Sequence, residues 1–231
     1  MAVTTAGPDG PNSYGRLRPD DVMKLRSDLW HTVHAERAAL VDDLAGLRSE
    51  QWATPSLCDG WDIHDVVAHL AATATLSHPG FVKEFLLVGL SSSRIVDKQV
   101  RAGRLRRPAE SLSALRSAID QTVSPPQPMI TRLIEIIVHG EDIRRPLQIH
   151  HDYSTTHITE ALGYLASDRR SGGKTRLAGL RLHATDANVV VGDGDQVEGP
   201  AVSLLLAATG RRVALADLTG PGRQRLDRRL R

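Results

Sequence analysis

The chain has 231 residues, 41% hydrophobic and 24% charged, so it is long enough to bury a sizeable core and to form one large and one small domain. Its 29 basic and 27 acidic residues give a formal charge of +2, which argues against the strongly basic surface of a nucleic-acid-binding protein. The single cysteine excludes an intramolecular disulfide and fits a reducing, cytoplasmic location.

The N-terminal region predicts a tail followed by a long helix. Residues 1–19 are rich in Gly, Pro, Ser and Thr and lack the apolar core of a signal peptide, which is typical of a flexible tail. Residues 20–47 carry apolar side chains at helical spacing and predict the first helix. No run of about 18 apolar residues occurs in the sequence, which argues against a membrane span.

The stretch 52–72 predicts a second helix with an unusual polar residue inside it. Asp62 has the position of an N-cap, and Asp65 lies in the first turn, where a carboxylate favours the helix dipole. His69 follows four residues after Asp65 and on the same face. A single histidine in such a helix is more often a core residue than a ligand, so this stretch alone leaves both readings open.

The middle of the chain contains breaks between helical segments. Residues 81–107 predict a helix interrupted at 91–93, where three serines follow one another. The basic cluster at 101–107 has no interleaved aromatic residues, so we interpret it as a solvated helix end. A short helix is predicted over 110–122, and the prolines that follow it redirect the chain.

The stretch 133–145 predicts a largely buried helix with one polar seam. At about 100° per residue, Glu135, His139 and Asp142 fall in a strip roughly 60° wide, and apolar residues cover most of the remaining circumference. A buried carboxylate needs a partner, and an imidazole one turn away with a metal ion between them would meet the desolvation cost. The alternative is that the seam is the solvent face of the helix. Pro146 is expected to close it.

The last third of the sequence changes from helical periodicity to alternation. It predicts a small α/β module. In chain order we expect a helix over 154–166, a basic linker over 169–174, two short strands over 180–184 and 189–191, a helix over 200–208 and a basic helix from Pro221.

Two sequence runs, PSLCDGWDIHDVVAHL and VHGEDIRRPL, together resemble the mycothiol-dependent maleylpyruvate isomerase family, which belongs to a wider DinB-like group of metalloproteins. The resemblance covers roughly residues 25–145, with a second match at 179–220. It implies a mainly α fold, a DinB-like four-helix bundle followed by a small α/β C-terminal module. The domains expected are a flexible tail over 1–19, the metal-binding bundle over 20–150, and a linker helix with the α/β domain over 151–231.

The resemblance also implies a set of functional residues. In that family a histidine of the second bundle helix and an ExxxH pair of the last bundle helix bind a divalent metal, usually zinc, and the matching positions here are His69, Glu135 and His139. An arginine of the C-terminal module is expected to face the cleft as a catalytic residue. Its nearest match is Arg211 in the run ATGR, with Arg212 as the alternative.

Three other residues near the expected ligands have open roles. Asp65 either caps its helix or orients His69, and Asp142 either orients His139 or approaches the metal. Cys58 precedes the His69 helix, and we interpret it as structural, because in the family the reacting thiol comes from the small-molecule cofactor.

The function implied by the resemblance is a metal-dependent enzyme that activates mycothiol for transfer to, or cis–trans isomerisation of, a small electrophile. Two neutral imidazoles and one carboxylate suit zinc and leave a position where a thiol is held as thiolate. The alternatives are a non-catalytic ligand-binding or regulatory protein and a zinc-dependent hydrolase that needs no thiol. The expected partners are a small thiol and a small electrophile, with no nucleic acid or membrane, while the substrate and the oligomeric state stay open.

Overall fold

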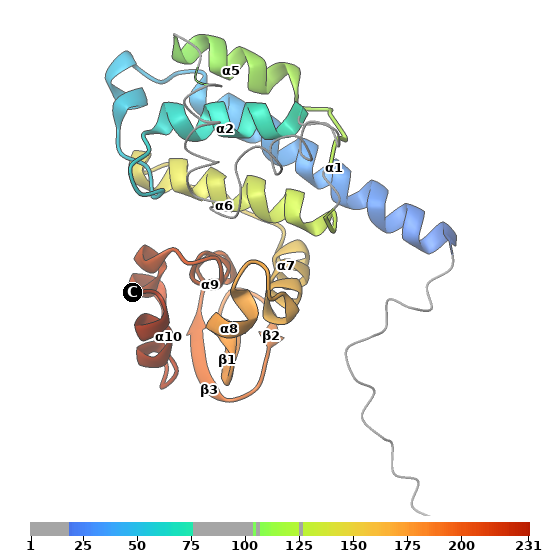
Figure 1. Ribbon diagram of the computed structural model, residues 1–231, viewed down its shortest axis with the longest axis vertical. Coiled ribbons are helices and arrows are strands. Elements are labelled where there is room, and N and C mark those ends of the chain that lie inside the picture. The colour runs from blue at the N-terminus through green and yellow to red at the C-terminus, as the bar shows by residue number, and fades with distance from the viewer. Residues whose placement is uncertain (1–18, 76–103, 105–106, 125–126) are drawn as a thin grey trace, which may run out of the picture.

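The structure is a computed structural model that describes residues 19–75, 104, 107–124 and 127–231 (Figure 1). Nearly all of the expected N-terminal tail lies outside the described residues. The same is true of the helix expected over 81–107 and of its basic cluster, apart from Arg104 and Arg107.

Four helices of the described residues pack as a bundle in the N-terminal part, which confirms the predicted architecture. They are α1 (Pro19–Leu44), α2 (Ile63–Thr75), α5 (Pro108–Ser117) and α6 (Ile130–Leu147), with the short 3-10 helix η2 (Ser49–Ala53) before α2. Helix α1 packs against α5 and α6, and α2 packs against the same two helices. Helix α6 continues one residue past Pro146, and the chain then turns at Gln148, which has a left-handed backbone conformation (φ 57°).

The C-terminal part is a small α/β module, as predicted. Its elements are α7 (Thr155–Ser167), α8 (Gly173–Leu177), β1 (Leu180–Ala184), β2 (Val190–Val191), β3 (Asp195–Gly199), α9 (Ala201–Ala208), the 3-10 helix η3 (Arg212–Asp217) and α10 (Arg223–Arg229). The described strands form one sheet in the order β2-β1-β3. Strand β1 pairs antiparallel with β2 and parallel with β3, so that Leu182 lies between Val191 and Val197.

Two elements of this module differ from the sequence prediction. No element was predicted over 195–199, where β3 lies, and α8 begins inside the linker that was expected over 169–174. Each depends on a contact made elsewhere in the fold: β3 is paired along its whole length with β1, and Gly173 at the start of α8 packs directly against the carbonyl group of Leu165. Such tertiary contacts can outweigh the local helix or strand propensity of a segment. They are made with residues elsewhere in the chain, so the sequence pattern of the segment does not reveal them.

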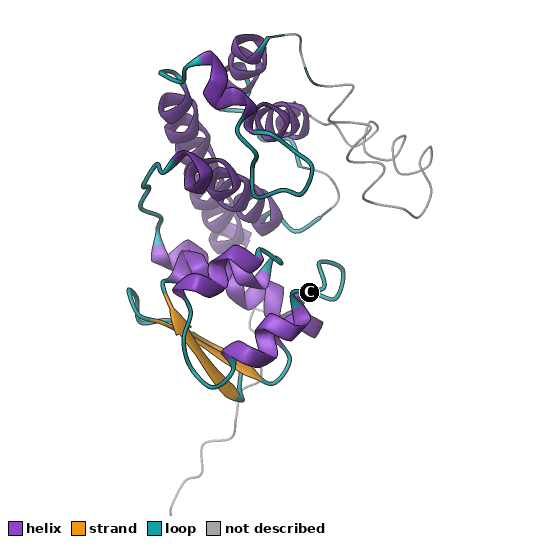
Figure 2. Cartoon of the chain, turned by 90° about the vertical axis from the view of Figure 1, so that its left-hand side faces the viewer, coloured by secondary structure: helices purple, strands orange, loops and turns teal. Residues whose placement is uncertain are grey.

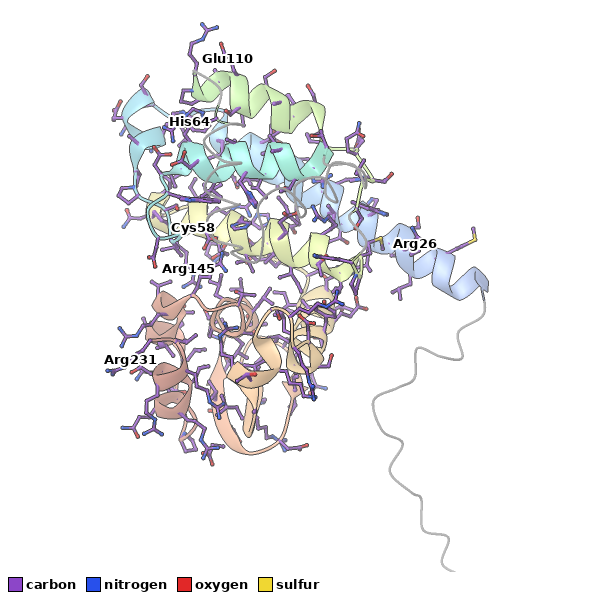
Figure 3. The ribbon with its side chains drawn as sticks, in the orientation of Figure 1. Arg26, Cys58, His64, Glu110, Arg145 and Arg231 are labelled. Atoms are coloured by element: carbon purple, nitrogen blue, oxygen red, sulfur yellow. The ribbon has the colours of Figure 1, made fainter. Side chains whose placement is uncertain are left out.

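Helix α6 lies at the boundary between the bundle and the module (Figure 1), and Figure 2 shows the strands of the module below the helices of the bundle. Its buried apolar side chains, such as Ile136 and Ile143, belong to one contiguous cluster that continues into α7 and α9. Figure 3 shows Cys58 and Arg145 at this boundary. The exact domain limits stay a prediction. No helix among the described residues is long and apolar enough to cross a membrane.

Candidate metal and thiol site

The polar seam predicted for α6 exists and faces the protein interior. Leu133, Ile136 and Ile137 are buried on the other sides of the helix. Asp142 is fully buried, and the side chains of Glu135 and His139 are each only 17% exposed. The alternative reading of the seam as a solvent face is therefore wrong.

Helix α2 supplies His69, and its first turn is held by two aspartates. The backbone N–H of Asp65 donates to Asp62 Oδ1 at 2.8 Å, and the N–H of Asp62 donates to Asp65 Oδ2 at 3.2 Å. Arg104 adds an ion pair to both carboxylates. Of the two roles considered for Asp65, helix capping is the one observed.

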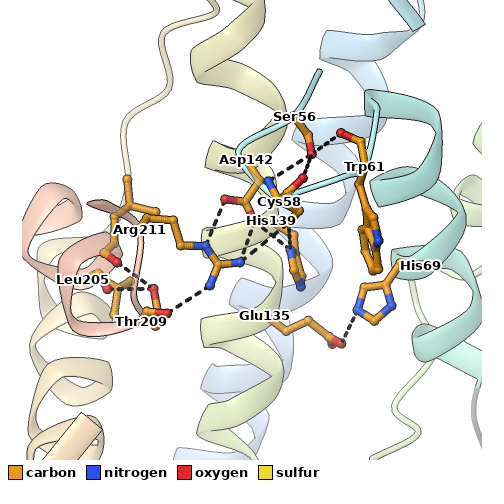
Figure 4. Close-up of polar contacts among 11 residues, drawn as sticks. Ser56, Cys58, Trp61, His69, Glu135, His139, Asp142, Leu205, Thr209 and Arg211 are labelled. Carbon is orange, nitrogen blue, oxygen red and sulfur yellow. Dashed lines mark hydrogen bonds and ion pairs between the residues drawn. The ribbon is translucent and has the colours of Figure 1, made fainter. Parts of the chain in front are cut away.

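Among the predicted metal ligands, His69 lies close to each of the other two, Glu135 and His139 (Figure 4). His69 Nε2 is 3.8 Å from Glu135 Oε1, and the ring centroids of His69 and His139 are 5.0 Å apart at an interplanar angle of 76°. The ring of Trp61 covers His69 from the other side, with centroids 5.4 Å apart. Burial, reinforced by the nearby His139 and Arg132, lowers the pKa of His69 to about 3. His69 is therefore neutral near pH 7, which is the form that binds a metal.

Glu135 is held in place by Arg132, a residue that the sequence analysis did not identify. Arg132 Nη1 lies 2.9 Å from Glu135 Oε2 and 3.3 Å from the carbonyl oxygen of Thr73 on α2. One carboxylate oxygen of Glu135 thus faces the guanidinium and the other faces His69. The spacing of three residues on one helix was the available signal, because it brings opposite charges together.

The buried carboxylate of Asp142 gathers groups from three segments of the chain. His139 Nδ1 lies 2.8 Å and Cys58 Sγ 3.1 Å from Oδ2. Arg211 donates to both oxygens, from Nε to Oδ1 at 3.1 Å and from Nη2 to Oδ2 at 2.7 Å. Burial alone would raise the pKa of Asp142, but the hydrogen bonds from His139 and Arg211 outweigh it and hold this pKa well below its usual range. The expected orientation of His139 by Asp142 is thus present.

Cys58 belongs to this cluster, and its interpretation as a structural residue stays a prediction. Its thiol donates to Asp142, and burial together with the Asp142 charge raises its pKa to about 12, so it stays protonated. Cys58, His139 and Asp142 present possible ligand atoms within 4.8 Å of one another, a set compatible with a divalent cation. No local pattern around Cys58 indicates this contact, because its partners are remote in sequence.

The C-terminal module contributes Arg211 to the Asp142 cluster, whereas Arg212 pairs elsewhere. Arg212 pairs with Asp227 of α10 at 2.8 Å on the surface, whereas Arg211 extends across the boundary to Asp142 (Figure 4). Of the two, Arg211 is therefore the one that contacts the bundle, while its catalytic role stays a prediction.

Two pockets open on either side of Cys58. The larger, about 580 Å³, lies between the loop at residues 56–59 and the module segment at 209–213, and Arg211 lines it. The smaller, about 470 Å³, extends along the bundle side past Trp61 to Asp65. Both volumes are of the size that holds a small organic ligand.

Comparison with known proteins agrees with this architecture. Residues 33–126 match the family described as "Mycothiol maleylpyruvate isomerase N-terminal domain". Two solved structures, a crystal structure of the mycothiol-dependent maleylpyruvate isomerase and one of a point mutant of it, superpose with TM-scores of 0.62 and 0.61. Each is 14% identical to this chain and the alignment covers 85% of this chain and 92% of the other, a likeness of fold. No curated protein matches the sequence.

Proposed function

We propose that this protein is a metal-dependent enzyme that activates a small thiol, mycothiol. Its residues 33–126 match the mycothiol maleylpyruvate isomerase N-terminal domain, and its fold is that of the mycothiol-dependent isomerase. The activated thiol is transferred to a small electrophile or catalyses its cis–trans isomerisation. The observation that supports the proposal is that His69 on α2 lies close to both Glu135 and His139 on α6.

The donor set fits a divalent cation such as zinc. His69, Glu135 and His139 offer two imidazole nitrogens and one carboxylate, the ligand types that zinc prefers, and leave a fourth position for a thiol. When bound, the cation supplies the positive charge that lowers the pKa of a thiol toward neutrality. The protein itself has no thiolate to offer, because Cys58 is protonated.

The surrounding residues prepare the site for this role. Burial keeps the imidazole of His69 free of a competing proton, and Arg132 turns one oxygen of Glu135 away so that the other faces His69. Asp142, held ionised, can only accept a hydrogen bond, so His139 Nδ1 carries the proton and the lone pair of Nε2 is free to bind. The larger pocket, lined by Cys58 and Arg211, gives a thiol and an electrophile room beside those two residues.

A second donor set, Cys58 with His139 and Asp142, competes for the same imidazole. We favour the first set because Asp142 already has a guanidinium as its cationic partner, with Arg211 bound to both of its oxygens. His139 Nδ1 and Asp142 Oδ2 are also at hydrogen-bonding distance, 2.8 Å, whereas two ligand atoms around a tetrahedral zinc would lie farther apart, about 3.3 Å.

Elemental analysis of untagged protein tests the proposal. We expect about one equivalent of metal in the parent and little in the His139→Ala variant. The two donor sets are separated by His69→Ala and Cys58→Ala: loss of metal in the first variant and retention in the second support the proposed site. Metal in His69→Ala with none in Cys58→Ala would assign the ion to the Cys58 set.

Turnover assays then separate the functional classes. A metal-loaded parent is expected to convert electrophilic substrates only when mycothiol or a related small thiol is added. Hydrolysis without any thiol would indicate a zinc-dependent hydrolase. Bound metal with no turnover in either condition would indicate a ligand-binding or regulatory protein. The cytoplasmic location remains an expectation.

A further inference from the structure

The guanidinium of Arg211 is almost entirely occupied by the protein itself. Nε and Nη2 donate to the two oxygens of Asp142, Nη1 lies 3.2 Å from the carbonyl oxygen of Thr209, and Nη2 also approaches Cys58 Sγ at 3.8 Å. A guanidinium whose Nε and Nη2 both donate to one buried carboxylate has few N–H groups left to bind a second anion. Direct recognition of a substrate carboxylate therefore does not explain its geometry.

We propose that Arg211 is a positioning residue: it fixes the Asp142 carboxylate, which in turn fixes the tautomer and orientation of His139, so that the C-terminal module completes the metal site of the bundle. The inference rests on the proposed function and assigns a positioning residue to that site. The chain of contacts runs from Arg211 through Asp142 to His139, with every link at 3.1 Å or less.

The effect follows from how few contacts hold Asp142. Its oxygens are held by the guanidinium on one side and by His139 and Cys58 on the other. Removal of Arg211 takes away the contact to Oδ1 described above and one of those to Oδ2, so that His139 and Cys58 are left to restrain rotation of the carboxylate, and Oδ2 is held less firmly 2.8 Å from His139 Nδ1. Outer contacts of this kind commonly alter metal affinity by about 10–100-fold.

A second group of contacts, made by Arg145, holds the module against α6. Arg145, on α6, donates from Nη1 to Asp217 Oδ2 at 2.8 Å and from Nη2 to Ser203 Oγ at 2.9 Å, and Ser203 donates to the same oxygen of Asp217 at 2.7 Å. Asp217 is the last residue of η3, which begins directly after Arg211. Docking of η3 through Arg145 therefore places Arg211 at the start of that element against Asp142.

Zinc affinity, measured by competition with a chromophoric chelator, is the first test. We expect Arg211→Ala to bind zinc about 10–100-fold more weakly than the parent. Arg211→Lys should recover only part of this loss, because a single ammonium cannot bridge both oxygens of Asp142. Arg212→Ala is the matched control, since Arg212 pairs with Asp227 on the surface, and it should bind zinc like the parent. Circular dichroism confirms that each variant is folded.

A double-variant comparison shows whether the effect passes through Asp142. If it does, Arg211→Ala combined with Asp142→Ala should bind zinc no more weakly than Asp142→Ala alone. Unchanged zinc affinity in Arg211→Ala, or losses that add in the double variant, would overturn the inference.

The tautomer of His139 provides a readout without metal. In ¹⁵N NMR of the metal-free parent, the His139 signals should show a proton on Nδ1, with assignment by their loss in His139→Ala. Arg211→Ala should show a mixture of tautomers, and Arg212→Ala should not. An unchanged His139 signal in Arg211→Ala contradicts the positioning role. If the parent binds no zinc, the proposed function fails, but the tautomer measurement still decides whether Arg211 positions His139.

Discussion

The hydroxyl group of Tyr153 lies 2.8 Å from the guanidinium of Arg144, a side chain that is only 1% exposed. The same hydroxyl donates to Glu141 Oε1 at 2.8 Å. One phenol in the segment after α6 thus joins a buried cation to a buried anion, both on α6. Arg144 pairs further with Asp43 of α1 at 2.7 Å, so the contact links the bundle to the chain that leaves it.

Tyr153→Phe should therefore destabilise the protein although it keeps the ring. Loss of the hydroxyl leaves Arg144 and Glu141 each without one buried partner, and we expect the free energy of unfolding to fall by about 2–3 kcal/mol. Urea denaturation measures the change. The matched control is Tyr164→Phe on α7, a half-buried tyrosine for which we expect a change within about 0.5 kcal/mol. Equal stability of the parent and Tyr153→Phe would contradict this role.

Arg37 on α1 should be equally important for the end of α5. Its side chain is 3% exposed, and Nη1 donates to the carbonyl oxygens of Ala118, Ile119 and Gln121 at 3.2, 3.2 and 2.8 Å. Arg37→Met leaves these carbonyl groups without that donor, and we expect a loss of about 2–4 kcal/mol in the free energy of unfolding. Arg26→Met, at an exposed position of the same helix, serves as the control and should change stability little.

The pKa of His69 predicts how stability depends on pH in the metal-free protein. The unfolded side chain binds a proton below about pH 6.5, whereas the folded one does so only below about pH 3. Between these values the unfolded state holds the extra proton, so the free energy of unfolding should fall as pH decreases, by up to about 1.4 kcal/mol per pH unit. Asp142 also loses its stabilising contribution in acid, but only below its unfolded pKa of 3.8.

Denaturation at several pH values between about 4 and 7, with a chelator present, checks this expectation. The His69→Gln variant has no imidazole to titrate, so its free energy of unfolding should depend less steeply on pH than that of the parent. Parallel pH dependences in the two proteins would show that burial of His69 does not determine the slope.

The capping of α2 should also be measurable. Asp62 accepts the N–H of Asp65 and pairs with Arg104, so Asp62→Ala should cost about 1 kcal/mol of stability. Asp59→Ala removes an exposed carboxylate from the same loop and is the control. Hydrogen exchange in the first turn of α2 should become faster in Asp62→Ala only. Unchanged exchange in that turn would mean that the cap does not set the start of the helix.

The sequence predicted the elements whose pattern is local. The apolar spacing of α1, the cap of α2, the polar seam of α6 and the alternation of β1 are each encoded within a few residues, and the structure confirms them. Strand β3 was missed because its run DQVEG has a single apolar residue, Val197, and its ladder depends on β1. Its pairing is thus a tertiary property.

The same distinction applies to the site. His69, Glu135 and His139 were predicted because helical spacing and a family resemblance point to them, and His69 lies near each of the other two. The roles of Cys58 and Arg132 were missed. The thiol of Cys58 reaches Asp142 across the loop–helix contact, which is closed by the backbone bond from Leu57 N–H to the Asp142 carbonyl. No spacing rule within one element could reveal such a contact.

The position of Asp142 and Arg145 on α6 has a consequence for synthesis of the chain. The ribosome completes α6 before it begins the module, so the nascent bundle carries the Asp142 carboxylate and the Arg145 guanidinium before Arg211 and Asp217 exist to meet them. Until then these charged groups favour water over burial. The face of α6 that later contacts the module should therefore stay hydrated during translation. It becomes buried only when the C-terminal module has folded against it.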